Sequence, residues 1–270
     1  MLKTIEFQDH NQLYITDEPD TLRELLDEGL YAIPEYTDEN ISLSWPHTDY
    51  AVTNLRELLT PDEVNDVPTS AVDSESISLY DKDILVEGVD FIPDSIIKIY
   101  QRLAKLPWHI LDTKNLSLRE MTVEDIDIFY SIYDNEALRF VEPLFDNPLD
   151  EKIYTQNYIR DIYGFYGYGL WTVIDKSTGN VIGRAGISNR DGFDIPELGF
   201  VLAGEYRGRG LGYEICRAIL DYARCELGFT KIQSLVLPNN EVSINLLKKL
   251  GFMDTGDMYD EYEVYEMKVI

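Results

Sequence analysis

The sequence predicts a mixed α/β protein in two parts. A small α/β domain over residues 1–112 precedes a larger domain over residues 115–270, in which helices flank a central mixed β-sheet. Three observations support this organisation. At 270 residues the chain is long for one domain and sufficient for two. Short strand signals alternate with helical stripes along both halves, as is typical of α/β proteins. A segment with Pro107 and Asp112 separates the two halves.

In the N-terminal part, short apolar runs alternate with helical signals. The runs 13–16, 31–33 and 50–52 predict strands. Asp17 offers an N-cap for a helix with a leucine stripe that ends near Gly29. Further helices are expected over residues 54–59, before Pro61, and over residues 96–106. Strand–helix–strand spacing this short favours a right-handed parallel unit, so we expect a Rossmann-like arrangement.

From residue 116 the pattern changes to longer strands. Strands are expected over residues 116–119, 170–174, 181–188, 198–202 and 231–237, with a hairpin turn at 175–180 and a terminal hairpin over 252–270. Thr122 and Asp125 form a capping box for a helix that ends near Tyr133, and Pro148 begins another that ends near Tyr163. A long helix over residues 211–227 carries an apolar stripe at four-residue spacing, and a shorter one covers 243–250.

The formal charge of −27 limits the classes of partner. Residues 1–112 contain 24 acidic and 7 basic residues, so the acidity is concentrated in the N-terminal part. A surface of this charge is unsuited to phosphate backbones, which excludes nucleic acid as a partner, whereas a cationic acceptor would be attracted. The sequence shows neither a membrane span nor a signal peptide, and Cys216 and Cys225 are too far apart for a disulfide. A cytoplasmic protein with reduced thiols is the expectation.

Residues 205–212, between a predicted strand and the long helix, carry the strongest chemical signal. Glycines permit a tight turn and leave backbone N–H groups uncovered, and the helix N-terminus is a positive dipole end. Arg207 and Arg209 add charge, so the segment predicts a pyrophosphate site. A dinucleotide fingerprint is excluded because Tyr213 occupies the place of its third glycine, and the Gly-Lys-Ser/Thr of a P-loop is absent.

Two blocks resemble the acetyl-CoA-binding motifs of the GNAT family of N-acetyltransferases. Arg207, Gly210 and Gly212 match its Gln/Arg-x-x-Gly-x-Gly/Ala signature. About 30 residues later, residues 238–243 and 250–252 are similar to its Asn-x-x-Ser and Leu-Gly-Phe elements. The resemblance covers about 155 residues and is greatest to the RimJ/RimL-like branch. It implies acetyl transfer from acetyl-CoA to the primary amine of a small molecule or protein.

The resemblance also assigns residues to the cofactor, coenzyme A. It implies that backbone amides of the loop hold the pyrophosphate, that the strand around Phe200 pairs with the pantetheine arm, and that Asn240 and Ser243 lie near the arm and the thioester. The expected cofactor-binding residues are Phe200, Val201, Leu202, Arg207, Gly208, Arg209, Gly210, Leu211, Gly212, Asn240 and Ser243. No metal site is expected.

A lysine-like amine is protonated at neutral pH, so a base is useful for the reaction. None of the three histidines lies in the C-terminal part, and the resemblance favours Glu197 as the base, acting through water. The tyrosine that the family uses as general acid is replaced here by Leu247. Ser243 or a water molecule could then protonate the leaving thiolate, or the thiolate leaves unaided.

The aromatic residues 163–171 border the expected acceptor pocket. Tyr166, Tyr168 and Trp171 are therefore candidate substrate-binding residues that would cage an amine by cation–π contact, although packing is the alternative role. Two other functions remain open, a non-catalytic acyl-CoA sensor and an acidic scaffold. The N-terminal part resembles units of haloacid-dehalogenase-like Rossmann folds but lacks their Asp-x-Asp motif. We interpret it as a module for docking, for homodimer formation or for substrate selection.

Overall fold

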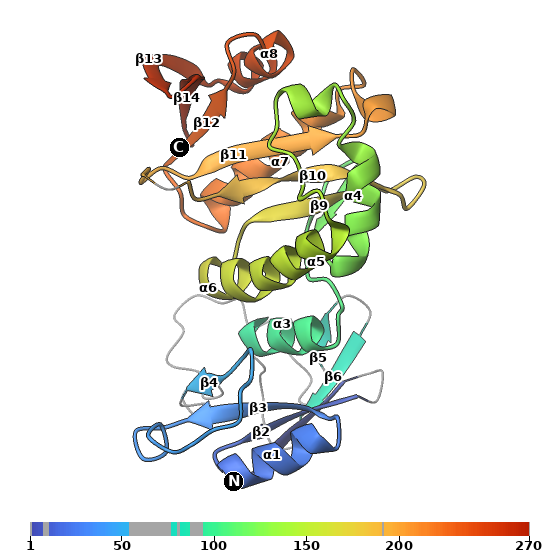
Figure 1. The fold of residues 1–270 in the computed structure, drawn as a ribbon, viewed down its shortest axis with the longest axis vertical. Helices are drawn as coiled ribbons and strands as arrows, with labels where there is room; N and C mark the ends of the chain where they lie inside the picture. Colours follow the sequence, from blue (N-terminus) through green and yellow to red (C-terminus); the bar gives the residue numbers. More distant parts are fainter. Residues whose placement is uncertain are drawn as a thin grey trace. The chain divides into compact units, whose positions relative to one another are not determined.

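The computed structural model describes residues 2–7, 11–53, 77–79, 82–86, 94–190 and 192–269 (Figure 1). The chain divides into two compact units, Met1–Leu106 and Pro107–Ile270. Within the described ranges, no helix is both long and apolar enough to cross a membrane. Cys216 is a buried free thiol and Cys225 is an exposed one.

The first unit contains a six-stranded mixed sheet in the order β4-β3-β2-β1-β6-β5. Its strands are β1 (Lys3–Phe7), β2 (Gln12–Thr16), β3 (Tyr31–Tyr36), β4 (Val52–Thr53), β5 (Ile77–Leu79) and β6 (Lys82–Val86), and its helices are α1 (Pro19–Asp27) and α3 (Asp94–Leu103). The predicted parallel unit is present, since β2 pairs with β3 and β3 with β4 in parallel. Leu13, Ile15 and Leu22 are fully buried in the core of this unit.

Other features of this unit differ from the expectation. The sequence analysis did not predict β1, although apolar and polar residues alternate along it. Because β1 pairs with β2 and β6 in the antiparallel direction, the sheet is mixed, and a Rossmann-like domain is not confirmed. The helix expected over residues 54–59 lies outside the described residues.

The second unit is built on an eight-stranded sheet in the order β13-β14-β12-β11-β10-β9-β8-β7 (Figure 1). Its strands are β7 (His109–Asp112), β8 (Leu116–Arg119), β9 (Leu170–Asp175), β10 (Val181–Ser188), β11 (Glu197–Leu202), β12 (Lys231–Val236), β13 (Met253–Tyr259) and β14 (Tyr262–Lys268). All but β7 were predicted. The segment that contains β7 seemed a domain junction, but it pairs with β8 in the antiparallel direction.

The helices of this unit follow the predicted periodicity. They are α4 (Ile126–Ile132), α5 (Pro148–Asn157), α6 (Gly164–Tyr166), α7 (Leu211–Cys225) and α8 (Glu241–Leu250), with a π-helical segment over Tyr158–Tyr163 between α5 and α6 and short 3-10 turns at Val123–Asp125, Ala137–Arg139 and Gly204–Tyr206. The predicted stripe of α7 is confirmed, because Ile215, Ile219 and Ala223 are fully buried. These side chains join one core with Trp171 and Ile187 of the sheet.

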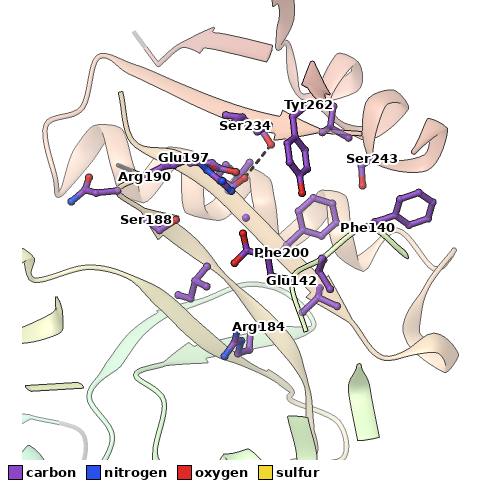
Figure 2. A pocket seen from close by; sticks show the side chains of 18 of the residues that line it. Phe140, Glu142, Arg184, Ser188, Arg190, Glu197, Phe200, Ser234, Ser243 and Tyr262 are labelled. Atoms are coloured by element: carbon purple, nitrogen blue, oxygen red, sulfur yellow. Dashed lines mark hydrogen bonds and ion pairs between the residues drawn. The ribbon is translucent and has the colours of Figure 1, made fainter. Parts of the chain in front are cut away.

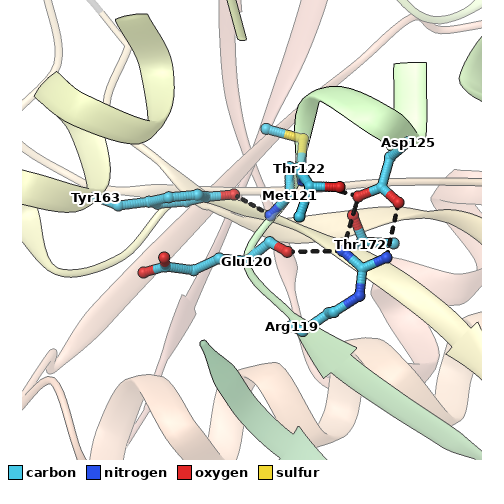
Figure 3. Close-up of polar contacts among 7 residues, drawn as sticks. All are labelled: Arg119, Glu120, Met121, Thr122, Asp125, Tyr163 and Thr172. Carbon is cyan, nitrogen blue, oxygen red and sulfur yellow. Dashed lines mark hydrogen bonds and ion pairs between the residues drawn. The ribbon is translucent and has the colours of Figure 1, made fainter. Parts of the chain in front are cut away.

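A buried polar network anchors the start of α4 to the sheet (Figure 3). Asp125 accepts two hydrogen bonds of 2.7 Å from Arg119 of β8, one of 2.8 Å from the Thr172 hydroxyl of β9 and one of 2.9 Å from the Thr122 amide. Burial alone would raise the pKa of Asp125, but the bonds and charge of Arg119, together with the bonds from Thr122 and Thr172, outweigh it and lower this pKa below the ordinary value of 3.8. The network thereby holds α4 against the face of the sheet that carries the site.

Candidate active site

Strands β11 and β12 separate in the middle of the sheet, and a cavity opens where they part. The two strands are parallel, but their pairing is confined to Glu197 and Gln233. Beside this split lies a cavity of about 690 Å³ (Figure 2). Its walls come from β10, β11, β12, β14, α8 and the segment from Tyr133 to Tyr168.

The backbone of β11 faces this split at Phe200. Ser234 of β12 donates to the Leu198 carbonyl at 3.1 Å, and Arg207 donates to the Leu202 carbonyl at 2.9 Å. In a strand, backbone groups of alternate residues point to the same side. The N–H and C=O of Phe200 therefore also point away from β10, into the split. Of the three strand residues expected to meet the cofactor, Phe200 and Val201 line the cavity, whereas Leu202 does not.

The loop before α7 has the conformation that the glycines predicted. Gly208 and Gly210 have φ values of +70° and +81°, in the left-handed region that favours glycine. A Cβ at either glycine would meet nothing within 4 Å, so their backbones are open to a ligand. The helical bonds of α7 begin with the Glu214 amide donating to the Gly210 carbonyl at 3.1 Å. The amides before it are the unsatisfied donors of a helix N-terminus, and this loop can hold an anion.

The two arginines of the loop have different environments. Arg207 donates to Glu136 at 3.0 Å and to Asp134 at 3.1 Å, besides the Leu202 carbonyl. This guanidinium already fixes the loop to the segment after α4, which the sequence pattern did not indicate. Arg209 is exposed and lies over the Tyr206 ring at 5.2 Å. Arg209 is therefore the arginine of the loop that remains available to a phosphate.

Helix α8 brings its N-terminus to the cavity. The Asn240 side chain caps the helix by accepting from the Ser243 amide at 3.2 Å, and both residues line the cavity. Close packing between the helices also explains Gly212, because a Cβ there would lie 3.3 Å from the Leu246 side chain. Leu247, at the position of the family's tyrosine, is 1% exposed and forms part of the cavity wall.

The expected base, Glu197, is held by a neighbouring guanidinium. Its Oε2 accepts from Arg190 Nε at 2.6 Å, and its side chain is 11% exposed. Burial alone would lower the pKa of Arg190, but the hydrogen bond and charge of Glu197, together with the charge of Glu142, outweigh it and raise this pKa. Both residues line the cavity. The Glu197 carboxylate is thus present at the site, with one oxygen already occupied.

A second carboxylate, that of Glu142, lines the cavity from the loop after Phe140, which contains no sequence motif. Glu142 is exposed, lines the cavity, and among the described residues has no hydrogen bond or ion pair. In the view of Figure 2 it lies between the Arg190–Glu197 pair and Arg184. The Tyr262 hydroxyl, from the start of β14, also points into the cavity there. Neither Glu142 nor Tyr262 belongs to a sequence motif, so only the fold reveals them.

One wall of the cavity is an aromatic and apolar stripe along α5, the π-helical segment and α6. It consists of Tyr154, Tyr158, Ile162 and Tyr166, at intervals of four residues. In an α-helix such a stripe drifts around the axis, because one turn holds 3.6 residues. The wider π-turn drifts in the opposite sense. The change of helix type therefore keeps the stripe on the cavity.

The predicted aromatic residues do not all reach the cavity. Tyr166 and Tyr168 line it, and the Tyr168 hydroxyl donates to Asn189 at 2.9 Å. Trp171, also expected to bind substrate, is fully buried and packs on Tyr222 in the core instead. Strand alternation places Trp171 on the face of β9 away from the cavity. Gly169 permits the close packing here, since a Cβ would lie 2.6 Å from the Tyr158 hydroxyl.

No cluster of His, Cys, Asp and Glu suited to a metal ion occurs within the part of the chain that the structure describes. In this part, His47 and His109 contact Asp49 and Asp112 respectively, and neither lines the cavity. The groups that could act on a substrate are therefore carboxylates, hydroxyls and guanidinium groups.

Comparisons with known proteins agree with this geometry. Residues 115–253 match the model of the acetyltransferase (GNAT) domain. An uncharacterized protein of Bacillus subtilis, YkkB, is 36% identical over 88 residues, which are 32% of this chain and 51% of that protein. The match thus spans about half the length of YkkB. An uncharacterized N-acetyltransferase of Bacillus licheniformis, p20, is 28% identical over 165 residues, which are 59% of this chain and 90% of that protein.

Among solved structures, an acetyltransferase from Agrobacterium tumefaciens is similar with a TM-score of 0.52 and 25% identity. The similarity covers 58% of this chain and 92% of that one. The family match includes the loop before α7 and most residues that line the cavity.

Proposed function

The chain belongs to the GNAT acetyltransferase family, and from this premise we propose that it transfers the acetyl group of acetyl-CoA to a primary amine bound in the cavity between β11 and β12. Two observations together carry the proposal. The backbone N–H and C=O of Phe200 are open in the split, and the loop before α7 presents unsatisfied backbone amides. The family uses acetyl-CoA. The amide groups of its pantetheine arm can pair with the N–H and C=O of a strand, and its pyrophosphate needs N–H donors such as those at a helix N-terminus.

The residues present suit coenzyme A. The amides from Arg209 to Gly212 would hold the pyrophosphate, with Arg209 as the charged partner. Phe200 would pair with the amide groups of the pantetheine arm in the manner of an added strand. Asn240 and Ser243 would lie beside the arm. Arg207, which the sequence motif includes, would hold the loop in place rather than bind the phosphate, because three hydrogen bonds already engage it.

In the reaction, the protonated amine first gives one proton to a base, and the neutral nitrogen then forms a bond to the thioester carbon. The carbon–sulfur bond breaks, and the second proton lost by the nitrogen passes to the leaving thiolate, directly or through water. Two cavity carboxylates can accept the first proton, directly or through water. Of these, Glu142 has free oxygens, whereas Glu197 is bonded to Arg190. We therefore assign Glu142 as the proton acceptor and Glu197 as the residue that positions Arg190. The sequence-based assignment of Glu197 as the base remains the competing prediction.

The thiolate of coenzyme A leaves and takes up a proton. Ser243 and Tyr262 both present a hydroxyl to the cavity, while Leu247 has no proton to donate. The thiolate is only a weak base, because the pKa of its thiol is about 8.5, so a proton from water is also sufficient. Loss of either hydroxyl should therefore have a smaller effect on the rate than loss of the base.

The finer features of the function rest on the sequence motifs. These support the RimJ/RimL-like branch and an amine-bearing small molecule or protein as acceptor. The proposed cytoplasmic location rests instead on the spacing of Cys216 and Cys225, which favours reduced thiols. For the first unit, docking, homodimer formation or substrate selection remain the proposed roles.

The test is a calorimetric titration of the full chain with acetyl-CoA, followed by a thiol-release assay with a panel of primary amines. A Gly210→Glu variant places a negative charge at the expected pyrophosphate site and should abolish saturable binding. Binding with amine-dependent thiol release supports the enzyme. Binding without turnover of any amine would favour an acyl-CoA sensor instead. Absence of binding by the unmodified protein would leave only an acidic scaffold.

A further inference from the structure

Arg184 is a cavity-lining cation without an acidic partner. It lies on β10 opposite Val201 of β11, and its guanidinium stacks over the rings of Phe129 and Tyr133 at 5.2 and 5.4 Å. Its Nε is buried and has no hydrogen-bond acceptor. The Met121 sulfur, 3.9 Å from its NH1, is neutral. The Tyr133 phenol is neutral as well, because burial raises its pKa.

This isolation is unusual in so acidic a chain. The protein has 50 acidic and 23 basic residues, and three other arginines of this unit have carboxylate partners, namely Asp125 for Arg119, Glu197 for Arg190, and Asp134 and Glu136 for Arg207. A partly buried guanidinium without an anion is costly. The two aromatic rings offset part of that cost by cation–π attraction, and the Tyr133 hydroxyl also accepts a hydrogen bond from the guanidinium, but neither residue supplies a negative charge. The remaining donors of Arg184, the buried Nε among them, are therefore available to a ligand anion.

The remaining charges of the cavity define the complementary ligand. Four charged side chains line it, and Arg190 and Glu197 neutralise one another. Arg184 is left as a cation without an acidic partner in the described part of the chain. Glu142 is left as an anion that forms no close ion pair there, although its charge helps to raise the pKa of Arg190. A ligand that satisfies both must carry a cationic or proton-donating group and an anionic group. A polyamine would satisfy Glu142 but would place a second positive charge in the cavity with Arg184.

We propose that the acceptor is a small amino acid-like molecule, in which a carboxylate binds Arg184 and the primary amine lies toward Glu142 and the thioester. A carboxylate suits the planar guanidinium fork in a bidentate manner. A phosphate dianion would require a second free cation, and the cavity has none among its described residues. The inference rests on the proposed acetyltransferase function and names the chemical class of its acceptor.

The experiment compares wild type and Arg184→Gln in acetyl transfer to two matched series. One series contains glycine, β-alanine, 4-aminobutyrate and 5-aminopentanoate, and the other contains alkylamines and diamines of equal length. We expect wild type to prefer one member of the amino acid series at least tenfold over its matched amine. Arg184→Gln should raise the KM for that acid at least tenfold, change kcat much less, and leave the affinity for acetyl-CoA unaltered.

Arg217→Gln is the matched control, because it removes the same charge from the exposed face of α7, where Arg217 pairs with Asp221. Equal turnover of acids and matched amines by wild type would overturn the inference without touching the acetyltransferase function, even if Arg184→Gln did not fold. Weaker acetyl-CoA binding by Arg184→Gln would also overturn it, since Arg184 would then serve the cofactor. If no amine is acetylated, a calorimetric titration of the protein–CoA complex with the same amino acids tests the binding site. Binding by wild type that Arg184→Gln loses supports the carboxylate site and refutes the enzyme, whereas absence of binding refutes both.

Discussion

Replacing Arg209 by glutamine should weaken acetyl-CoA binding, whereas the same change at Arg207 should chiefly destabilise the fold. Arg209 is exposed, and its recorded contact is the face of the Tyr206 ring at 5.2 Å, so it can turn toward a phosphate at little cost. A charge-assisted hydrogen bond contributes about 1.5–3 kcal/mol. Because the site is exposed to solvent and salt, we take the lower value, which corresponds to about a tenfold rise in Kd.

Arg207, in contrast, is held by bonds within the protein and contributes to stability rather than to phosphate binding. Its side chain is 26% exposed and donates to the Leu202 carbonyl, Glu136 and Asp134. Loss of the bond to the buried Leu202 carbonyl should lower the free energy of unfolding by about 1–3 kcal/mol, whereas the ion pairs with the exposed Asp134 and Glu136 contribute little. The affinity for acetyl-CoA should change by less than about threefold, since no phosphate contact is removed.

Both variants can be compared by calorimetric titration with acetyl-CoA at two salt concentrations and by thermal melting. Removal of a phosphate contact should also reduce the salt dependence of binding for Arg209→Gln. The reasoning is refuted if Arg207→Gln loses as much affinity as Arg209→Gln while its melting temperature stays at the wild-type value. In that case the ion pairs of Arg207 would open when the cofactor binds.

Three further outcomes follow from the structure. Glu142→Gln should reduce kcat about 10²-fold or more and flatten its pH profile, whereas Glu197→Gln should have the smaller effect; the reverse order in steady-state assays would restore Glu197 as the base. Asp125→Asn should cost about 3–5 kcal/mol in urea unfolding, because Arg119 loses its buried partner, while Asp127→Asn, at an exposed ion pair, should cost less than about 1 kcal/mol. Since the folded-state pKa of Asp125 is lowered, its contribution is complete above the ordinary value of 3.8 and disappears as the pH falls through the lower folded-state value, so acid should destabilise wild type more than Asp125→Asn in melting experiments. Gly186→Ala should strongly reduce the melting temperature, because its Cβ would lie 2.0 Å from the Gly169 carbonyl oxygen; a melting temperature equal to that of wild type would show that β9 and β10 can separate locally.

The position and conformation of the loop before α7 were predictable from the sequence because the requirements of this turn are local. Gly208 and Gly210 adopt positive φ values that other residues disfavour, and the stripe that begins at Leu211 specifies where α7 starts. A strand, a glycine turn and a helix that follow one another directly can be recognised without knowing any distant contact. The same holds for most strands of the second unit, whose apolar runs reflect their own burial.

The partners of the charged residues were decided by the tertiary structure. Arg207 belongs to the motif, but Asp134 and Glu136, more than 70 residues earlier, occupy it. Arg184 and Glu142 belong to no motif, yet both line the cavity because β10 and the loop after Phe140 converge there. Backbone conformation and periodicity depend on neighbours in the chain, whereas the pairing of a charge depends on which distant elements the fold brings within a few ångströms. The sequence by itself therefore determined the family and the conformation of the loop before α7, and only the folded sheet decided which charged side chains line the cavity and which of them are paired.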